Sequence, residues 1–314
     1  MKKNPLLDFA RKMELSVKLP SKGRWYTDEI MDTMLNGEVG IFPMTPRDEL
    51  LQYNPDALLS GDTTIQIIES CVPSIKNAKD LLYNDANLLL LAIRKATYGD
   101  ELEQSVICPR CYEEASKLTE DEKAEADRTG RLKFTPQDNV FSISDILSCT
   151  QYLDDEYKMK LDNGLTVYFK PYTVKNKLNF ELTRINQQKI LDFYKNFNQE
   201  DLKNEEIRKD RINKITDIYL EMNKYGNEVI ASCILKIELP EPDGSFVDDY
   251  DMILEYISNT NSNYIQTLKE KIEEINSIGL PSELEYECSC CGHKWKSPFI
   301  EFNPTDFFDG SSSF

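Results

Sequence analysis

The sequence predicts an α+β protein that is mainly helical, with short strands and hairpins, and with distant segments joined by a four-cysteine clasp that resembles a zinc ribbon. Three observations predict this class. Apolar residues recur at helical spacing through much of the stretch from residue 173 to residue 278. Short alternating stretches bounded by Gly, Pro and Asn indicate strands and hairpins. Two paired-cysteine motifs, Cys108-Pro-Arg-Cys111 and Cys288-Ser-Cys-Cys291, stand far apart in the chain.

The first hundred residues are expected to form a mixed region. Residues 15–19 alternate like a strand, the turn Pro20-Ser-Lys-Gly23 follows, and a second short strand is expected at residues 38–42. Thr45 suits a helix N-cap and Pro46 suits the first helical position after it. Further helices are expected at residues 63–71 and at residues 85–98, where Gly99 provides the C-terminal stop of the second helix.

The elements that follow alternate between charged, extended and helical segments. A strand should enter the first cysteine motif at residues 105–108, and the highly charged stretch 114–131 reads as a linker or an exposed helix. A hairpin is expected around Asp162-Asn-Gly164. Helices are then expected over residues 173–235 with a polar break at residues 196–204, over residues 249–258, and over residues 262–278, before strands at residues 284–288 and 294–299. On the second helix of the pair, one apolar face is expected: Ile207, Ile212, Ile215, Ile218, Tyr219 and Met222.

The two cysteine motifs predict a shared structural zinc site with Cys108, Cys111, Cys288 and Cys291 as ligands. Each motif places two thiolates on one tight turn, and four thiolates complete a tetrahedral zinc site, so residues 112–287 would be an insert held at both ends. Two alternatives are free cysteines and a redox dithiol at each motif. Cys290 is the natural substitute for a neighbouring ligand, and His293 is another candidate ligand. The remaining cysteines, Cys71, Cys149 and Cys233, are expected to be small core residues.

The wide separation of the two paired-cysteine motifs suggests a division of the chain into four parts. An N-terminal mixed domain would cover residues 1–104, and the zinc-ribbon-like clasp would combine residues 105–118 with residues 283–301. A mainly helical insert would cover residues 119–282, and residues 302–314 would form a C-terminal tail. Phe307 and Phe308 in this tail are adjacent and flanked by aspartates, which predicts that they are buried against the same chain or against a partner.

Composition excludes several classes of function. A net charge of −18 and a pI near 4.6 argue against binding to a nucleic-acid backbone, which requires clustered Lys and Arg. No apolar stretch has the length of a signal peptide or a transmembrane helix, so a cytosolic protein without membrane insertion is expected. His293 is the sole histidine of the sequence, so the sequence cannot provide the several histidines of a histidine-rich catalytic zinc site. We therefore expect no enzyme and no catalytic residue, although a pair of catalytic carboxylates is not ruled out by counting acidic residues.

Several ordered motifs resemble a known family. They are Leu19-Pro-Ser-Lys-Gly-Arg-Trp-Tyr26, Phe42-Pro-Met-Thr-Pro-Arg-Asp-Glu-Leu-Leu51, Leu58-Leu-Ser-Gly61, the helix at residues 85–98, Ile107-Cys-Pro-Arg-Cys111, the late Cys-Gly-His turn, and Phe302-Asn-Pro-Thr-Asp-Phe-Phe308. This arrangement is similar to the baseplate hub protein family of T-even-type contractile-tailed bacteriophages. The likeness is close over residues 15–111 and 284–308, and between them it is only an order of helices.

The resemblance implies a late viral protein that is a structural or assembly component of the baseplate hub. Its partners would be other hub, tail tube, spike or tape-measure proteins. It would be found in the host cytoplasm during assembly and then in the tail baseplate of the virion. Two other readings stay open at this point, namely a zinc-ribbon adaptor protein outside a phage tail and a peptidoglycan hydrolase of the tail tip.

Overall fold

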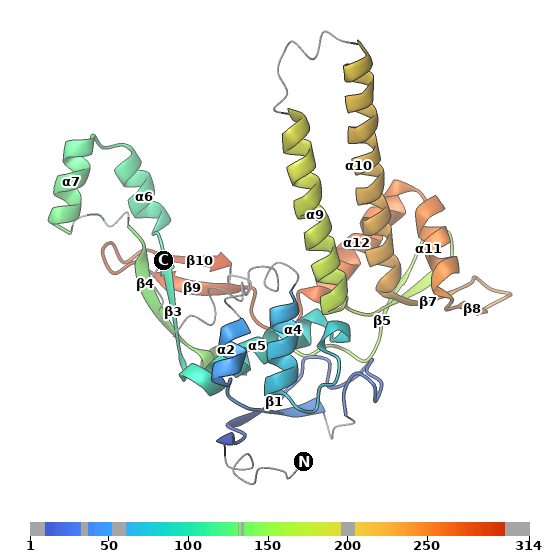
Figure 1. Cartoon of the computed structure of the whole chain (residues 1–314), viewed down its shortest axis with the longest axis horizontal. Coiled ribbons are helices and arrows are strands. Elements are labelled where there is room, and N and C mark those ends of the chain that lie inside the picture. The colour runs from blue at the N-terminus through green and yellow to red at the C-terminus, as the bar shows by residue number, and fades with distance from the viewer. Residues whose placement is uncertain are drawn as a thin grey trace.

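The computed structural model describes residues 10–32, 37–51, 61–130, 132, 135–195 and 205–298. It confirms the predicted fold class, because helices are combined with small antiparallel sheets. In Figure 1, two arms extend from a central body. One arm contains strands β3 (Glu101–Val106) and β4 (Gln137–Ser142) and helices α6 (Pro109–Ser116) and α7 (Glu120–Arg128). The other arm is the helical pair α9 (Val174–Lys195) and α10 (Glu205–Ser232).

The first hydrophobic core forms around helix α5 (Tyr83–Tyr98), whose residues 88–93 are all buried. A helix that is apolar on every side must be covered on every side. Helix α5 packs against the antiparallel pair β1 (Leu15–Lys18) and β2 (Glu38–Ile41), against the helices α4 (Asp62–Cys71) and α8 (Ile143–Ser148), and against part of α9. Helix α2 (Pro46–Leu51) packs on α4, and a short 3-10 helix, η2 (Ala78–Asp80), precedes α5. Leu284 and Tyr286 join this core from the far end of the sequence.

Asp85, at the start of α5, holds the turn that follows β1. Its fully buried carboxylate accepts hydrogen bonds from the backbone N–H of Ser21 at 2.9 Å, from the Ser21 hydroxyl, and from the Tyr26 hydroxyl at 2.5 Å. Burial raises the pKa of Asp85 to about 6, while the hydrogen bonds from Ser21 and Tyr26 act in the opposite direction. The turn itself has left-handed backbone at two residues with side chains, Lys22 (φ 58°) and Trp25 (φ 64°). The buried carboxylate therefore stabilises a locally strained turn.

The second core lies beneath a four-stranded antiparallel sheet with the order β5-β6-β7-β8. These strands are β5 (Tyr157–Lys160), β6 (Thr166–Phe169), β7 (Ile234–Glu238) and β8 (Phe246–Val247). The predicted hairpin joins β5 to β6, and Gly164 takes a left-handed conformation in its turn (φ 88°). The inner face of the sheet packs with the end of α10 and with helices α11 (Tyr250–Asn259) and α12 (Ser262–Asn276).

Asn84 joins the two cores. Its side-chain amide donates to the backbone carbonyls of Ile275 at 3.4 Å, Asn276 at 3.1 Å and Ile278, at the end of α12. The last carbonyls of a helix have no partners within the helix, so a side-chain donor from another element satisfies them. Asn84 and Asp85 are neighbours, and α5 therefore begins at the point where the N-terminal turn and the end of α12 meet.

The residues expected on one apolar face of the second helix are not equally buried, because Ile218 is buried while Ile212 and Tyr219 are about half exposed. Two other local expectations are wrong. The helical stretch was expected to reach residue 235, but it ends at Ser232, and Ile234 already belongs to β7. Cys149 is exposed, since it follows the buried face of α8 at the end of that helix, whereas Cys71 and Cys233 are buried as expected.

Candidate metal centre

The four cysteines singled out by their spacing lie together. Each offers one sulfur atom, and the four sulfur atoms all lie within 4.8 Å of one another. The Sγ atoms of Cys108 and Cys291 are 3.8 Å apart, and so are those of Cys111 and Cys288. A tetrahedral zinc ion with Zn–S bonds of about 2.3 Å places neighbouring sulfur atoms about 3.8 Å apart. The donor set and its spacing are therefore compatible with a metal site.

The first two cysteines are positioned by the start of α6. Cys108 ends the segment after β3 and is the N-cap residue of α6, and Pro109 occupies the first helical turn. Cys111 lies within the same turn, and the Tyr112 N–H donates to the Cys108 carbonyl at 3.0 Å. A tight helical start therefore brings two thiols to the same side of the chain.

The second pair is positioned by the hairpin of β9 (Glu283–Glu287) and β10 (Lys294–Pro298). Cys288 follows β9 directly, its N–H donates to the His293 carbonyl at 2.9 Å, and its carbonyl accepts from the Gly292 N–H at 2.9 Å. Gly292 adopts φ 64°, the left-handed conformation that glycine accommodates most easily. This turn brings Cys291 back beside Cys288.

Gln137, at the start of β4, is the polar neighbour of the cluster. Its side-chain amide donates to Cys288 Sγ at 3.4 Å, and its Oε1 accepts from Ser289 N at 3.2 Å and Ser289 Oγ at 2.9 Å. Burial alone would raise the pKa of Cys288. Hydrogen bonds from the N–H of Cys291, the Gln137 amide and the N–H of Cys290 outweigh this effect and lower the pKa to about 6. The structure therefore favours a thiolate at Cys288. Burial raises the pKa of the Cys108 thiol.

Cys290 and His293 lie outside the cluster of four sulfur atoms. The Cys290 thiol donates to the Gly130 carbonyl at 3.1 Å, so it is directed toward the end of α7. The His293 ring stacks on Trp295 with ring centroids 5.9 Å apart, and Trp295 in turn stacks on Tyr286 at 5.7 Å. These contacts account for both side chains without a bond to a metal.

Apolar side chains from the first arm enclose the cluster. Ala126 from α7 and Leu132 are buried against Cys108, Cys111 and Cys288, and Leu118 and Trp295 pack at the edge. The charged stretch 114–131 contains the end of α6 and the whole of α7, and Ala126 of α7 is buried next to the sulfur atoms. Gln137 was not predicted from the sequence, because a single glutamine in a polar stretch carries no signal that associates it with cysteines in another segment.

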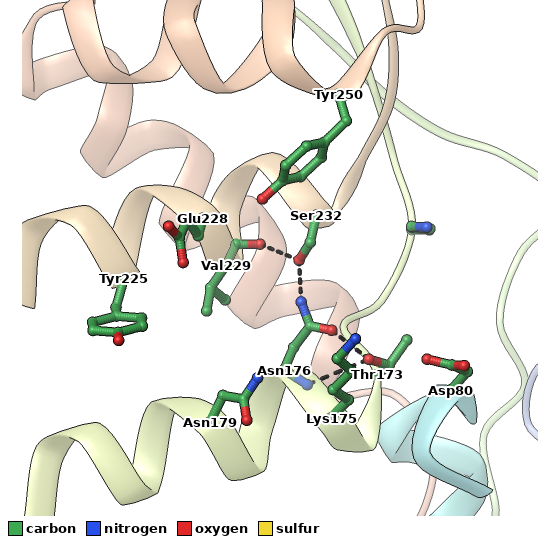
Figure 2. A pocket seen from close by; sticks show the side chains of 11 residues that line it. Asp80, Thr173, Lys175, Asn176, Asn179, Tyr225, Glu228, Val229, Ser232 and Tyr250 are labelled. Carbon is green, nitrogen blue, oxygen red and sulfur yellow. Dashed lines mark hydrogen bonds between the residues drawn. The ribbon is translucent and has the colours of Figure 1, made fainter. Parts of the chain in front are cut away.

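A second candidate site is the polar pocket at the base of α9 and α10, with a volume of about 370 Å³ (Figure 2). Asn176 lies at its centre, donating to Ser232 Oγ and accepting from Thr173 Oγ1. The Ser232 hydroxyl also donates to the Val229 carbonyl at 2.7 Å. These polar groups bind one another and hold the start of α9 against the end of α10, so their arrangement is explained by the joining of two helices.

Within the part of the chain that the structure describes, no helix combines the length and the apolar character needed to cross a membrane.

Comparison with known proteins assigns the chain to a family. No curated protein and no solved structure matches the chain. The family model described as T4 bacteriophage base plate protein matches residues 11–309, which is nearly the full length. The chain therefore belongs to the T4 bacteriophage base plate protein family.

Proposed function

We propose that this protein is a structural or assembly component of the baseplate hub, acting through contacts with other hub, tail tube, spike or tape-measure proteins. The observation that carries the proposal is the family match over residues 11–309. Membership supports a structural role in a phage baseplate, and the hub position rests on the ordered motifs at residues 19–26 and 42–51. The negative charge of −18 favours contact with proteins over contact with nucleic acid.

We further propose that Cys108, Cys111, Cys288 and Cys291 hold one structural zinc ion. The spacing of the sulfur atoms and their burial support this, because a closed shell of four thiolates leaves no open position for a substrate. Gln137 would orient the Cys288 sulfur from outside the ligand shell, as neighbours of metal ligands commonly do. The ion would then join the start of α6 to the β9–β10 turn and close the insert 119–282 at its two ends.

Catalysis is not part of the proposal. The family supports a structural role, and His293 stacks on Trp295, which accounts for its position in the fold. The hydrolase alternative requires a pair of carboxylates beside a substrate groove. Among the described residues, the most buried carboxylate is that of Asp85, and it instead accepts hydrogen bonds from Ser21 and Tyr26.

The test is complementation of a phage that lacks this gene, with variants supplied by the host cell. The wild type and His293→Gln should restore infectious particles to the same level, and the protein should cosediment with baseplates or with their assembly intermediates. Loss of infectivity in His293→Gln with zinc still bound would overturn the non-catalytic role. An absence of the protein from every baseplate intermediate, with normal tails formed without it, would favour the adaptor reading. Peptidoglycan turnover by the purified protein would favour the hydrolase.

A further inference from the structure

An apolar groove of about 410 Å³ lies on the side of α9 and α10 that faces α12. Its volume is in the lower part of the range for ligand pockets, which extends from about 300 to about 1,000 Å³. Ile230 and Ile272 are buried and line it, together with Gly226, Val229 and Tyr172. Asn176 and Val229 also line the polar pocket of Figure 2, so the base of the helical pair has a polar hollow and an apolar hollow that share these two residues.

Gly226 is the feature of this groove that internal packing does not explain. It lies inside the 28-residue helix α10, where glycine is about 1 kcal/mol less favourable than alanine. A Cβ atom built on Gly226 would meet no atom of the described residues within 4 Å. The glycine is therefore not required by a neighbouring element of this chain as described. Its effect is to leave backbone accessible in the wall of the groove, where another segment can approach closely.

The edge of the groove carries more positive than negative charge. Lys177 and Lys269 line it, with Glu273 as the acidic side chain. In a chain with 55 acidic and 37 basic residues, an apolar groove edged by lysines favours an occupant that is both apolar and acidic.

Residues 299–314, which lie outside the described residues, have this chemistry. They contain Phe299, Phe302, Phe307, Phe308 and Phe314, the acidic residues Glu301, Asp306 and Asp309, and no Lys or Arg. The described chain ends at Pro298, and the nine residues from there to Phe307 can span at most about 30 Å. We infer that the segment Asp306-Phe-Phe-Asp309 docks in the groove between α10 and α12 of its own chain, with a phenylalanine ring beside Gly226 and the aspartates near Lys177 and Lys269.

Hydrogen exchange of the full-length protein, followed by mass spectrometry, tests this. In the wild type, the amides of residues 302–309 should exchange at least tenfold more slowly than in Gly226→Leu, whose side chain fills the groove. Asn223→Leu adds the same side chain at an exposed position of α10 that does not line the groove, and it should keep the wild-type protection.

Charge reversal provides a test that does not depend on filling the groove. Lys269→Glu alters an exposed side chain at its edge and should reduce the protection several-fold, whereas Lys224→Glu, also exposed but outside the groove, should not. Unprotected tail amides in the wild type, or equal protection in the wild type and both groove variants, would overturn the inference. Protection that rises with protein concentration would overturn its intramolecular form and assign the groove to the tail of a second copy.

Discussion

Tyr26 and Asp85 are 59 residues apart in the sequence and share a hydrogen bond of 2.5 Å between Tyr26 Oη and Asp85 Oδ2. The same hydroxyl accepts from the Leu82 N–H at 3.0 Å, so it connects the turn after β1 with the first residues of α5. Burial raises the pKa of Tyr26 as well, and the neighbouring Asp85 raises it further. The buried acid Asp85 therefore binds two residues, Ser21 and Tyr26, of the motif at residues 19–26.

This relationship makes stability depend on pH in a defined direction. Asp85 has a pKa of about 6 in the folded protein against an ordinary value of 3.8, so the folded state binds the proton more tightly than the unfolded state. The free energy of unfolding therefore falls as the pH rises from about 4 to about 6, by about 3 kcal/mol, and is then constant with respect to this group. Asp85→Asn removes the titration, so the stability of the wild type relative to the variant should decrease over that interval.

Urea unfolding of both proteins at pH 4, 5, 6 and 7 measures this difference. The cysteine cluster is common to both proteins, so its own pH dependence cancels in the subtraction. Asp162→Asn, at an exposed residue, is the control and should reproduce the wild-type profile. A wild-type stability that rises relative to Asp85→Asn between pH 4 and pH 6 would contradict the assignment.

Loss of one proposed zinc ligand should loosen the protein without removing its helices. Joining Cys111 to Cys288 through a metal closes a loop of more than 170 residues, and the cross-link estimate for the resulting stabilisation is about 5 kcal/mol. Cys111→Ser should therefore lower the melting temperature sharply and leave most far-ultraviolet helicity, because α5 and α9–α12 keep their own apolar contacts. Cys290→Ser should retain both zinc and melting temperature.

Metal analysis accompanies that measurement. Freshly purified, reduced wild type should contain one zinc per four-cysteine site. Less than about half an equivalent, or an unchanged melting temperature in Cys111→Ser, would count against the metal joining these segments.

Gln137 should strengthen the binding of zinc at the four-cysteine site. Its amide is within hydrogen-bonding distance of Cys288 Sγ, and its oxygen fixes Ser289, so Gln137→Ala removes an orienting contact while leaving all four thiols. Removal of such outer contacts typically weakens metal binding about 10- to 100-fold. Competition with a zinc chelator measures the change, and Val140→Ala on the same strand, at an exposed residue, is the control. Equal affinity in both variants would show that Gln137 has no such role.

Asn84→Ala should weaken the connection between the two cores and lower the free energy of unfolding. The substitution removes the donor that serves the carbonyls at the end of α12, and buried polar groups left without partners typically lower the free energy of unfolding by about 1–3 kcal/mol. Chemical denaturation measures the loss. Asn213→Ala, at an exposed position of α10, should have almost no effect, and a similar loss in both variants would point to a general effect of asparagine removal.

Two glycines with the same backbone conformation should respond differently to alanine. Gly37 (φ 69°) and Gly130 (φ 67°) are both left-handed, so each alanine variant pays a strain of about 1 kcal/mol. A Cβ atom on Gly37 would lie 2.3 Å from the Lys22 carbonyl carbon, whereas one on Gly130 would meet no described atom within 4 Å. Gly37→Ala should therefore lower the free energy of unfolding by about 1–3 kcal/mol more than Gly130→Ala does, and it should show the lower melting temperature. Equal melting temperatures would show that the turn after β1 can move away from residue 37.

The identity of the elements follows largely from local sequence. The helix at residues 85–98, the hairpin at Asp162-Asn-Gly164 and the two helices of the pair were predicted because each depends on spacing and turn chemistry within a few residues. The polar break expected at residues 196–204 lies outside the described residues. The resemblance based on ordered motifs agrees with the family shown by the match over residues 11–309, and its narrower assignment to the hub stays a proposal. The tail motif at residues 302–308 lies outside the described residues, and so do residues 58–60 of the motif at residues 58–61.

The contacts between distant segments required the folded structure. The pairing of Asp85 with Ser21, of Gln137 with Cys288, and of Asn84 with the end of α12 each joins residues at least 64 positions apart. Polar side chains of these types occur throughout the sequence, and nothing local distinguishes those that become buried. Two matched cysteine motifs are rare enough to suggest that they meet, so the sequence identified the four sulfur atoms. The glutamine beside them acquires its role only when β4 is packed against the β9–β10 turn, because burial and partner geometry are properties of the whole fold.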